Sequence, residues 1–183
     1  LRRTLSQARP DVAPDDWRFE RDNQGKPHVA PGLPLLSFSL THCRGLAAVA
    51  VAPADTDVGV DAEPLNRRVE PLRLARRFFT VQEAEALAAM DDDDARRGGF
   101  LRLWTLKEAT VKALGSGIAG SLQGFAFAAC DPPTFVVLDP ALGEPERWFF
   151  WRQDWAGFSV ALALRLGLAQ KIDIDFQIAE PPP

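Results

Sequence analysis

Two acidic residues, at 61 and 63, are the first side chains here whose types and spacing suggest chemistry. They lie in the segment Gly-Val-Asp-Ala-Glu at 59–63, which has the composition of a short strand. Residues two apart on a strand point the same way, so Asp61 and Glu63 share one face and Ala62 points to the other. Neighbouring carboxylates repel unless a cation or a proton lies between them, and Mg²⁺ prefers oxygen ligands. The pattern predicts a divalent-metal site; the alternative is an exposed strand end with two ordinary acids.

A second group of charged residues lies on a predicted helix over 97–114. Residues four apart share a helix face, so Glu108 lies on the same side as Trp104 and Lys112. A third carboxylate with lysines, Lys107 included, matches the needs of phosphoryl transfer, because the acids hold a metal and the lysines neutralise phosphate charge. The alternative is a surface ion pair beside a core tryptophan.

Thr41 and His42 follow a predicted strand and precede a turn at Gly45. A hydroxyl and an imidazole at a strand end are suited to contact a diphosphate, although a lone histidine is more often structural. Cys43 has no partner that indicates nucleophilic catalysis, and we assign it to packing. Lys26 is presented by a Gly-Lys-Pro turn, which alone indicates little.

Five arginines with only Glu70 opposing them form a local basic patch in an otherwise acidic chain. Such a patch favours docking of an acidic partner, with a solvated helix face as the alternative. Positions 73, 76 and 77 share one face of a predicted helix. The five are Arg67, Arg68, Arg73, Arg76 and Arg77.

These residues need a mixed scaffold to position them. Hydrophobic periodicity predicts strands before residue 63, helices to 114, and strands again to 166, which is an α+β chain. The first three strands are expected to form a small antiparallel sheet, after a loop-rich lead-in over 1–34 with room for one short helix. The predicted strands are 36–40, 46–52, 58–62, 124–129, 134–138, 147–153 and 157–166, and the helices are 69–79, 81–90 and 97–114.

Predicted helix ends support this division. Thr80 and Glu83 form a capping box, residues 91–94 form an acidic loop, and Gly115 stops the long helix. We expect a single domain over 1–183, with subdomains of about 1–63 and 64–171 and a tail over 172–183.

Composition sets outer limits on the function. The chain has 183 residues, 46% of them hydrophobic, and a net charge of −4, which excludes disorder as the main state and argues against a broad nucleic-acid surface. Its longest apolar run, 46–54, is too short to span a membrane. Two cysteines cannot build a disulfide framework, and no secretory signal is recognised, so we expect a cytoplasmic protein.

Taken together, the motifs resemble those of the Sfp-type 4'-phosphopantetheinyl transferases. The resemblance covers about 17–124, and the order of the motifs is more specific than any one of them. The matching segments are Gly25-Lys26-Pro27, Thr41-His42-Cys43, Gly59-Val60-Asp61-Ala62-Glu63, Arg77-Phe78-Phe79-Thr80 with Glu83, and Trp104 to Lys112.

The resemblance implies transfer of 4'-phosphopantetheine from coenzyme A to a serine of an acyl or peptidyl carrier protein. The by-product is adenosine 3',5'-bisphosphate. The implied fold is a pseudo-twofold pair of α/β subdomains, usually acting as a monomer. Carried over by position, Asp61, Glu63 and Glu108 ligate Mg²⁺ (or Mn²⁺), and Glu108 and Lys112 are catalytic.

The remaining roles also follow from the resemblance. Thr41, His42 and Lys112 contact the phosphates of coenzyme A, and Lys26 contacts its adenosine end. We assign carrier docking to Arg73, Arg76 and Arg77.

Some features depart from the family pattern. Thr41 and Cys43 replace serines, Ala62 replaces a bulkier residue, and the sequence before Gly25 is short for the family. Two other functions stay open. One is a Mg²⁺-dependent nucleotide diphosphate hydrolase, which needs no carrier. The other is a catalytically degenerate homologue that still binds carriers.

Overall fold

The computed structural model describes residues 1–115, 122–128, 132–167 and 173–179. Its helices are α1 (Arg2–Ala8), α2 (Pro71–Phe78), α3 (Val81–Ala88) and α4 (Asp93–Leu114). Its strands are β1 (Phe19–Arg21), β2 (Pro27–Val29), β3 (Leu36–Cys43), β4 (Leu46–Pro53), β5 (Asp57–Pro64), β6 (Phe125–Phe127), β7 (Phe135–Leu138), β8 (Trp148–Trp155) and β9 (Phe158–Arg165).

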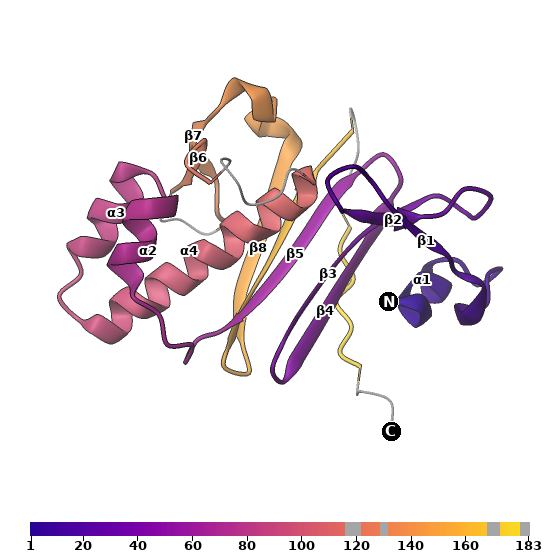
Figure 1. Ribbon diagram of the computed structural model, residues 1–183, viewed down its shortest axis with the longest axis horizontal. Helices are drawn as coiled ribbons and strands as arrows, with labels where there is room; N and C mark the ends of the chain where they lie inside the picture. The colour runs from indigo at the N-terminus through magenta and orange to yellow at the C-terminus, as the bar shows by residue number, and fades with distance from the viewer. Residues whose placement is uncertain (116–121, 129–131, 168–172, 180–183) are drawn as a thin grey trace.

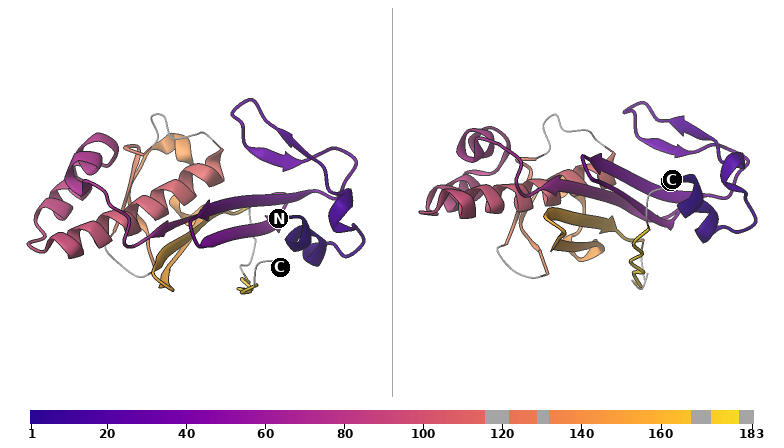
Figure 2. Two further views of the ribbon diagram at one scale, coloured as in Figure 1. Left: turned by 60° about the horizontal axis from the view of Figure 1, so that its bottom comes forward. Right: turned by 90° about the horizontal axis from the view of Figure 1, so that it is seen from below.

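The strands pair into small antiparallel sheets, so the predicted α+β class is confirmed. The sheets are β1–β2, β3–β4, β6–β7 and a three-stranded sheet in the order β5–β9–β8. Helices α2 and α3 lie at one end of the elongated molecule, and α1 with the β1–β2 hairpin lies at the other (Figures 1 and 2). In the described part of the chain, no helix is long and apolar enough to cross a membrane.

Helix α4 packs across the β5–β9–β8 sheet (Figure 1). Alanines of β9 at 161 and 163 join Leu106 and Ala109 of α4 in one buried cluster. On β5, Gly59 lies so close to the helix that a Cβ atom there would be 1.9 Å from the carbonyl oxygen of Ala109. The absence of a side chain at 59 is therefore what lets helix and strand approach closely.

The pairing of β5 differs from the sequence prediction of one sheet for the first three strands. The β3–β4 hairpin forms as expected, around a turn at Gly45 with φ +95°. Strand β5 instead pairs antiparallel with β9, from Asp57 opposite Arg165 to Pro64 opposite Phe158. Strand β3 reaches β5 through a side chain, because Ser39 Oγ accepts the Val60 amide at 3.1 Å. The predicted subdomain boundary between residues 63 and 64 stays a prediction. Strand β5, the last strand of the predicted first subdomain, pairs within a sheet whose other strands belong to the predicted second subdomain.

Helix ends agree with the sequence signals in most places. The capping box is present, with Thr80 Oγ1 accepting the Glu83 amide and the Glu83 carboxylate accepting the Thr80 amide. Gly115 ends α4 in the left-handed conformation. The acidic loop is shorter than predicted, because Asp92 caps the helix and α4 begins at Asp93. Acidic residues in a first turn are favoured by the helix dipole.

The short helix allowed for in the lead-in is present as α1, but both ends of the chain also form contacts that were not predicted. Within 1–34, α1 and the β1–β2 hairpin bury Trp17 in a cluster with Leu5 and Phe38, so this segment has its own small core. The described part of the predicted tail, 173–179, has no helix or strand. It nevertheless contacts the sheet, since the ring of Phe176 lies 4.4 Å from that of Trp151.

Candidate functional site

Asp61 is the centre of the predicted site, and three elements meet at it. One carboxylate oxygen, Oδ1, accepts a hydrogen bond from Thr41 Oγ1 on β3 at 3.0 Å. The same oxygen forms an ion pair with Lys112 Nζ on α4 at 2.6 Å. The other oxygen, Oδ2, is buried and has no hydrogen-bond partner. The structure thus brings together three residues that the sequence predicted for one site, from segments far apart in the chain.

Glu108 lies one helical turn before Lys112 and is also buried, with only 7% of its surface exposed. Its Oε1 atom is buried without a hydrogen-bond partner. Burial, and next the charge of Asp61, raise the pKa of Glu108 to about 7, against the opposing effect of Lys112. A carboxyl group in this state changes its protonation near neutral pH, which suits a general base.

Glu63 lies on the same face of β5, but its carboxylate forms an ion pair with Arg67. Burial raises the pKa of Glu63, and Arg67 opposes that rise. Sequence analysis assigned Arg67 only to the basic patch and missed this contact, although the four-residue spacing was visible in the sequence.

The state of their carboxylate oxygens shows which of the three acids suit a metal ion. In the parts of the chain that the structure describes, no three His, Cys, Asp or Glu side chains are grouped so that they could hold a metal ion. Asp61 and Glu108 do fit a hard cation, because each has a buried oxygen without a partner and oxygen is the ligand Mg²⁺ takes. Buried polar atoms are rarely left unpaired. The two unpaired oxygens are therefore best explained by a cation or a hydrogen-bond donor that binds beside them.

Other predicted site residues are placed differently with respect to this centre. Lys112 already holds Asp61, and it also contacts the Val60 carbonyl oxygen at 3.3 Å. His42 is exposed and alternates with Thr41 along β3, so the two side chains point to opposite faces of the strand. Contacts of Thr41, His42 and Lys112 with a phosphate stay predictions.

Lys26 sits at the end of α4 rather than on an open surface. Its Nζ donates to the carbonyl oxygen of Ala113 at 2.7 Å, and burial lowers the pKa of the ammonium group. A cation at a helix C-terminus is favoured by the dipole and satisfies a free carbonyl group. Lys26 therefore ties the β1–β2 turn to the helix that carries Glu108; its contact with adenosine stays a prediction.

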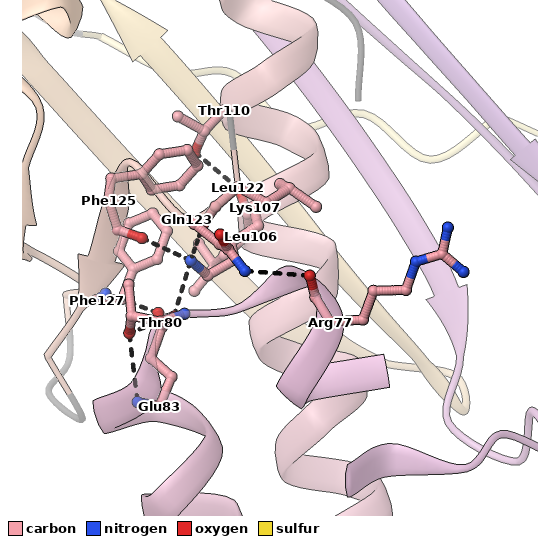
Figure 3. Close-up of polar contacts among 10 residues, drawn as sticks. All are labelled: Arg77, Thr80, Glu83, Leu106, Lys107, Thr110, Leu122, Gln123, Phe125 and Phe127. Carbon is pink, nitrogen blue, oxygen red and sulfur yellow. Dashed lines mark hydrogen bonds and ion pairs between the residues drawn. The ribbon is translucent and has the colours of Figure 1, made fainter. Parts of the chain in front are cut away.

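Lys107, the neighbour of Glu108, is fully buried, and its side chain points towards Glu83 and Phe125 (Figure 3). Its Nζ contacts Glu83 Oε2 at 2.8 Å and the carbonyl oxygens of Leu122 and Phe125 at 2.7 and 2.6 Å. Adjacent helix residues point about 100° apart, so only one of the two can face β5. The expectation that Lys107 serves the phosphate site is not met: its contacts are structural.

The three predicted docking arginines are exposed along α2. Arg73 pairs with Glu70 at 2.7 Å, and the Arg77 carbonyl oxygen accepts from Gln123 Nε2 at 3.1 Å (Figure 3). Beside Arg76 lies a groove of about 520 Å³ whose lining includes Phe79, Val81 and Ala84. Arg76 and an apolar lining thus lie next to each other, and Glu85 also lines the groove.

Comparison with known proteins identifies the family. The sequence profile of the 4'-phosphopantetheinyl transferase superfamily matches residues 57–163, which include Asp61, Glu63, Glu108 and Lys112. The chain belongs to this superfamily. The family recognised from the sequence motifs is thereby confirmed.

Individual relatives of this superfamily member match over part of their length. The 4'-phosphopantetheinyl transferase HetI of Nostoc sp. is 36% identical over 110 residues, and Sfp of Bacillus subtilis is 33% identical over 110 residues. These matches cover 59% and 60% of this chain, and 46% of each relative. The holo-[acyl-carrier-protein] synthase of Thermotoga maritima has a TM-score of 0.48 and 26% identity, covering 60% of this chain and 62% of that one.

Replacing Lys107 by Met is expected to lower the free energy of unfolding by about 3–5 kcal/mol, because it leaves the Glu83 carboxylate buried without its cation. Urea unfolding measures this loss, and adding Glu83→Gln should recover part of it. Arg73→Met is the matched control: it breaks an exposed ion pair and should cost less than about 1 kcal/mol. Equal stability of the Lys107 variant and wild type would show that the buried pair does not hold α4.

Replacing Glu108 by Gln is expected to stabilise the protein more at pH 8 than at pH 5. The folded state raises the pKa of Glu108 to about 7, so it binds the proton more tightly than the unfolded chain and loses stability as pH rises towards 7. Gln removes this loss, and we expect a gain in Tm at pH 8 of roughly 2–4 °C for each kcal/mol recovered, with a much smaller gain at pH 5.

Thermal unfolding in EDTA at both pH values measures this difference. Glu85→Gln, an exposed change on α3, should show no such dependence. The same gain at pH 5 and pH 8 for Glu108→Gln would contradict the raised pKa.

Proposed function

We propose that this chain transfers 4'-phosphopantetheine from coenzyme A to a serine hydroxyl of an acyl or peptidyl carrier protein. The reaction depends on Mg²⁺ and releases adenosine 3',5'-bisphosphate. One observation supports this above the rest: in a member of the transferase superfamily, Asp61, Glu108, Lys112 and Thr41 come together from β5, α4 and β3.

Asp61 and Glu108 are the residues that would hold the ion, and Glu63 is the third ligand of the proposal. When bound, Mg²⁺ neutralises the negative charge of the coenzyme A diphosphate. Support comes from the two unpartnered oxygens and from the concentration of negative charge. Lys112 is the single cation paired with Asp61 in the described residues, and it adds positive charge on the same side.

Glu108 is the proposed base. A neutral serine is a poor nucleophile, so a base must take its proton as the new bond to phosphorus forms. Without a cation, burial and the charge of Asp61 raise the pKa of Glu108 to about 7. A bound cation would lower that pKa, so the assignment as base rests on the position of Glu108 beside Asp61 and Lys112. The serine oxygen bonds to the phosphorus nearer pantetheine, the proton goes to Glu108, and the bond to adenosine bisphosphate breaks. Positioning and charge neutralisation contribute most of the rate, as in other phosphoryl transfers.

The carrier is proposed to dock on α2. Its exposed arginines at 73, 76 and 77 are complementary to an acidic helix, and the adjoining groove offers an apolar contact. Charge complementarity at an exposed surface affects association more than chemistry.

Replacing Asp61 by Ala is expected to abolish labelling of an apo carrier by coenzyme A, because it removes the centre that holds Lys112 and Thr41. Intact-mass analysis of the carrier, with coenzyme A and Mg²⁺, measures the transfer. Asp55→Ala, an exposed acid before β5, is the control and should label fully. Full labelling by the Asp61 variant would refute the site, and bisphosphate released without any carrier would favour the hydrolase.

Replacing Arg76 by Glu is expected to raise the KM for the carrier by roughly tenfold, the change that one repulsive pair of about 1.4 kcal/mol produces. The KM for coenzyme A should stay within about twofold. Steady-state kinetics with each substrate varied separates the two constants. Arg3→Glu, an exposed change on α1 at the far end of the molecule, is the control (Figure 1). Equal effects on both KM values would argue against docking on α2.

A further inference from the structure

Ser159 on β9 has a buried hydroxyl group that no partner satisfies. Its exposed fraction is 0%, and Oγ makes no hydrogen bond. Among the described residues, only four buried side-chain polar atoms lack a partner, and two of the others are Asp61 Oδ2 and Glu108 Oε1. The fourth, Arg97 Nε, lies on the first turns of α4. An unpaired buried hydroxyl destabilises the folded protein, so a serine at position 159 indicates that its hydroxyl has a use there.

The sheet register places Ser159 directly beside the candidate site. Ser159 is opposite Glu63 in the antiparallel pair of β9 and β5. Directly opposed side chains lie on the same face with Cβ atoms about 4.5–5.5 Å apart. This is also the face of Gly59 and Asp61, which α4 covers. Ala161 and Ala163, on the same face of β9, pack against α4.

The chemistry of the neighbouring groups shows what the hydroxyl can do there. An ionised carboxylate only accepts hydrogen bonds, whereas a serine hydroxyl can donate one. The ion pair with Arg67 holds the Glu63 carboxylate at the partly exposed edge of the site. The strand register places the base of the Glu63 side chain beside Ser159, on the buried side. The donor opposite Glu63 is therefore on the side where Asp61 and Glu108 have free oxygens.

We propose that Ser159 is a positioning residue of the metal site: when the three acids take up a cation, its hydroxyl turns to donate a hydrogen bond to the Glu63 carboxylate and holds it on the α4 face, with Asp61 and Glu108. Outer partners of this kind orient metal ligands, and their loss typically weakens metal binding by about 10–100-fold. The inference rests on the proposed function, since it assumes that the three acids take up a divalent cation. Nothing in the sequence marks Ser159, which lies 96 positions after Glu63.

The test measures cation binding and stability separately. Mn²⁺ is titrated into the full chain in the presence of coenzyme A, and the free ion is followed by electron paramagnetic resonance. Ser159→Ala should weaken Mn²⁺ binding about tenfold while leaving Tm unchanged or higher, because it removes an unsatisfied buried hydroxyl. Ser159→Cys, whose thiol is a weak donor, should give an intermediate affinity.

A matched control removes a buried hydroxyl that has a partner. Thr110 Oγ1 on α4 donates to the Leu106 carbonyl oxygen at 2.8 Å, so Thr110→Val should lower Tm and leave Mn²⁺ affinity unchanged. Wild-type affinity in Ser159→Ala would overturn the role of Ser159 alone. A lowered Tm with equal affinity losses in the Ser159 and Thr110 variants would also overturn it, as a general structural effect. No Mn²⁺ binding by wild type would overturn this inference together with the metal site; intact carrier labelling would then still support the transfer reaction.

Discussion

The close approach of α4 to β5 is the constraint on which the rest of the site depends. A Cβ atom at Gly59 would lie 1.9 Å from the Ala109 carbonyl oxygen and 2.5 Å from the Ala113 amide nitrogen, so only glycine permits this contact. Asp61 follows two residues later on the same face of the strand. The packing therefore decides that Asp61 meets Lys112 and that the charge of Asp61 acts on Glu108.

Helix α4 carries buried ionisable groups on two faces, and the two groups differ in how far neighbouring residues compensate their charge. Lys107 has an ion pair with Glu83 and two carbonyl contacts, so its charge is compensated and it ties the helix to α3 and β6. Glu108 faces β5 with an oxygen that has no partner, and its pKa is raised to about 7. Compensated buried charge holds a structure together, whereas an uncompensated carboxylate with a shifted pKa is typical of a functional site.

Local signals in the sequence were sufficient to predict most helices and strands and part of the candidate site. The capping box at Thr80 and the stop at Gly115 depend on contacts within a few residues, and both are confirmed. The pairing of β5 with β9 was missed, because the two strands are about a hundred residues apart and neither carries a mark of its partner. Lys107 was assigned to the phosphate site for a similar reason: its partner Glu83 lies on another helix, where the capping box had already accounted for it.

The sequence by itself determined the residue types, the α+β class and the family, since motif order and hydrophobic period are properties of the chain. It also showed that Asp61 and Glu63 share a strand face and that Glu108 and Lys112 share a helix face, because these follow from fixed backbone repeats. Only the tertiary structure decided which faces meet, which side chains already have partners, and which buried oxygens are left without one. Those outcomes depend on distances between segments remote in sequence, and burial together with neighbouring charge then sets how each group titrates.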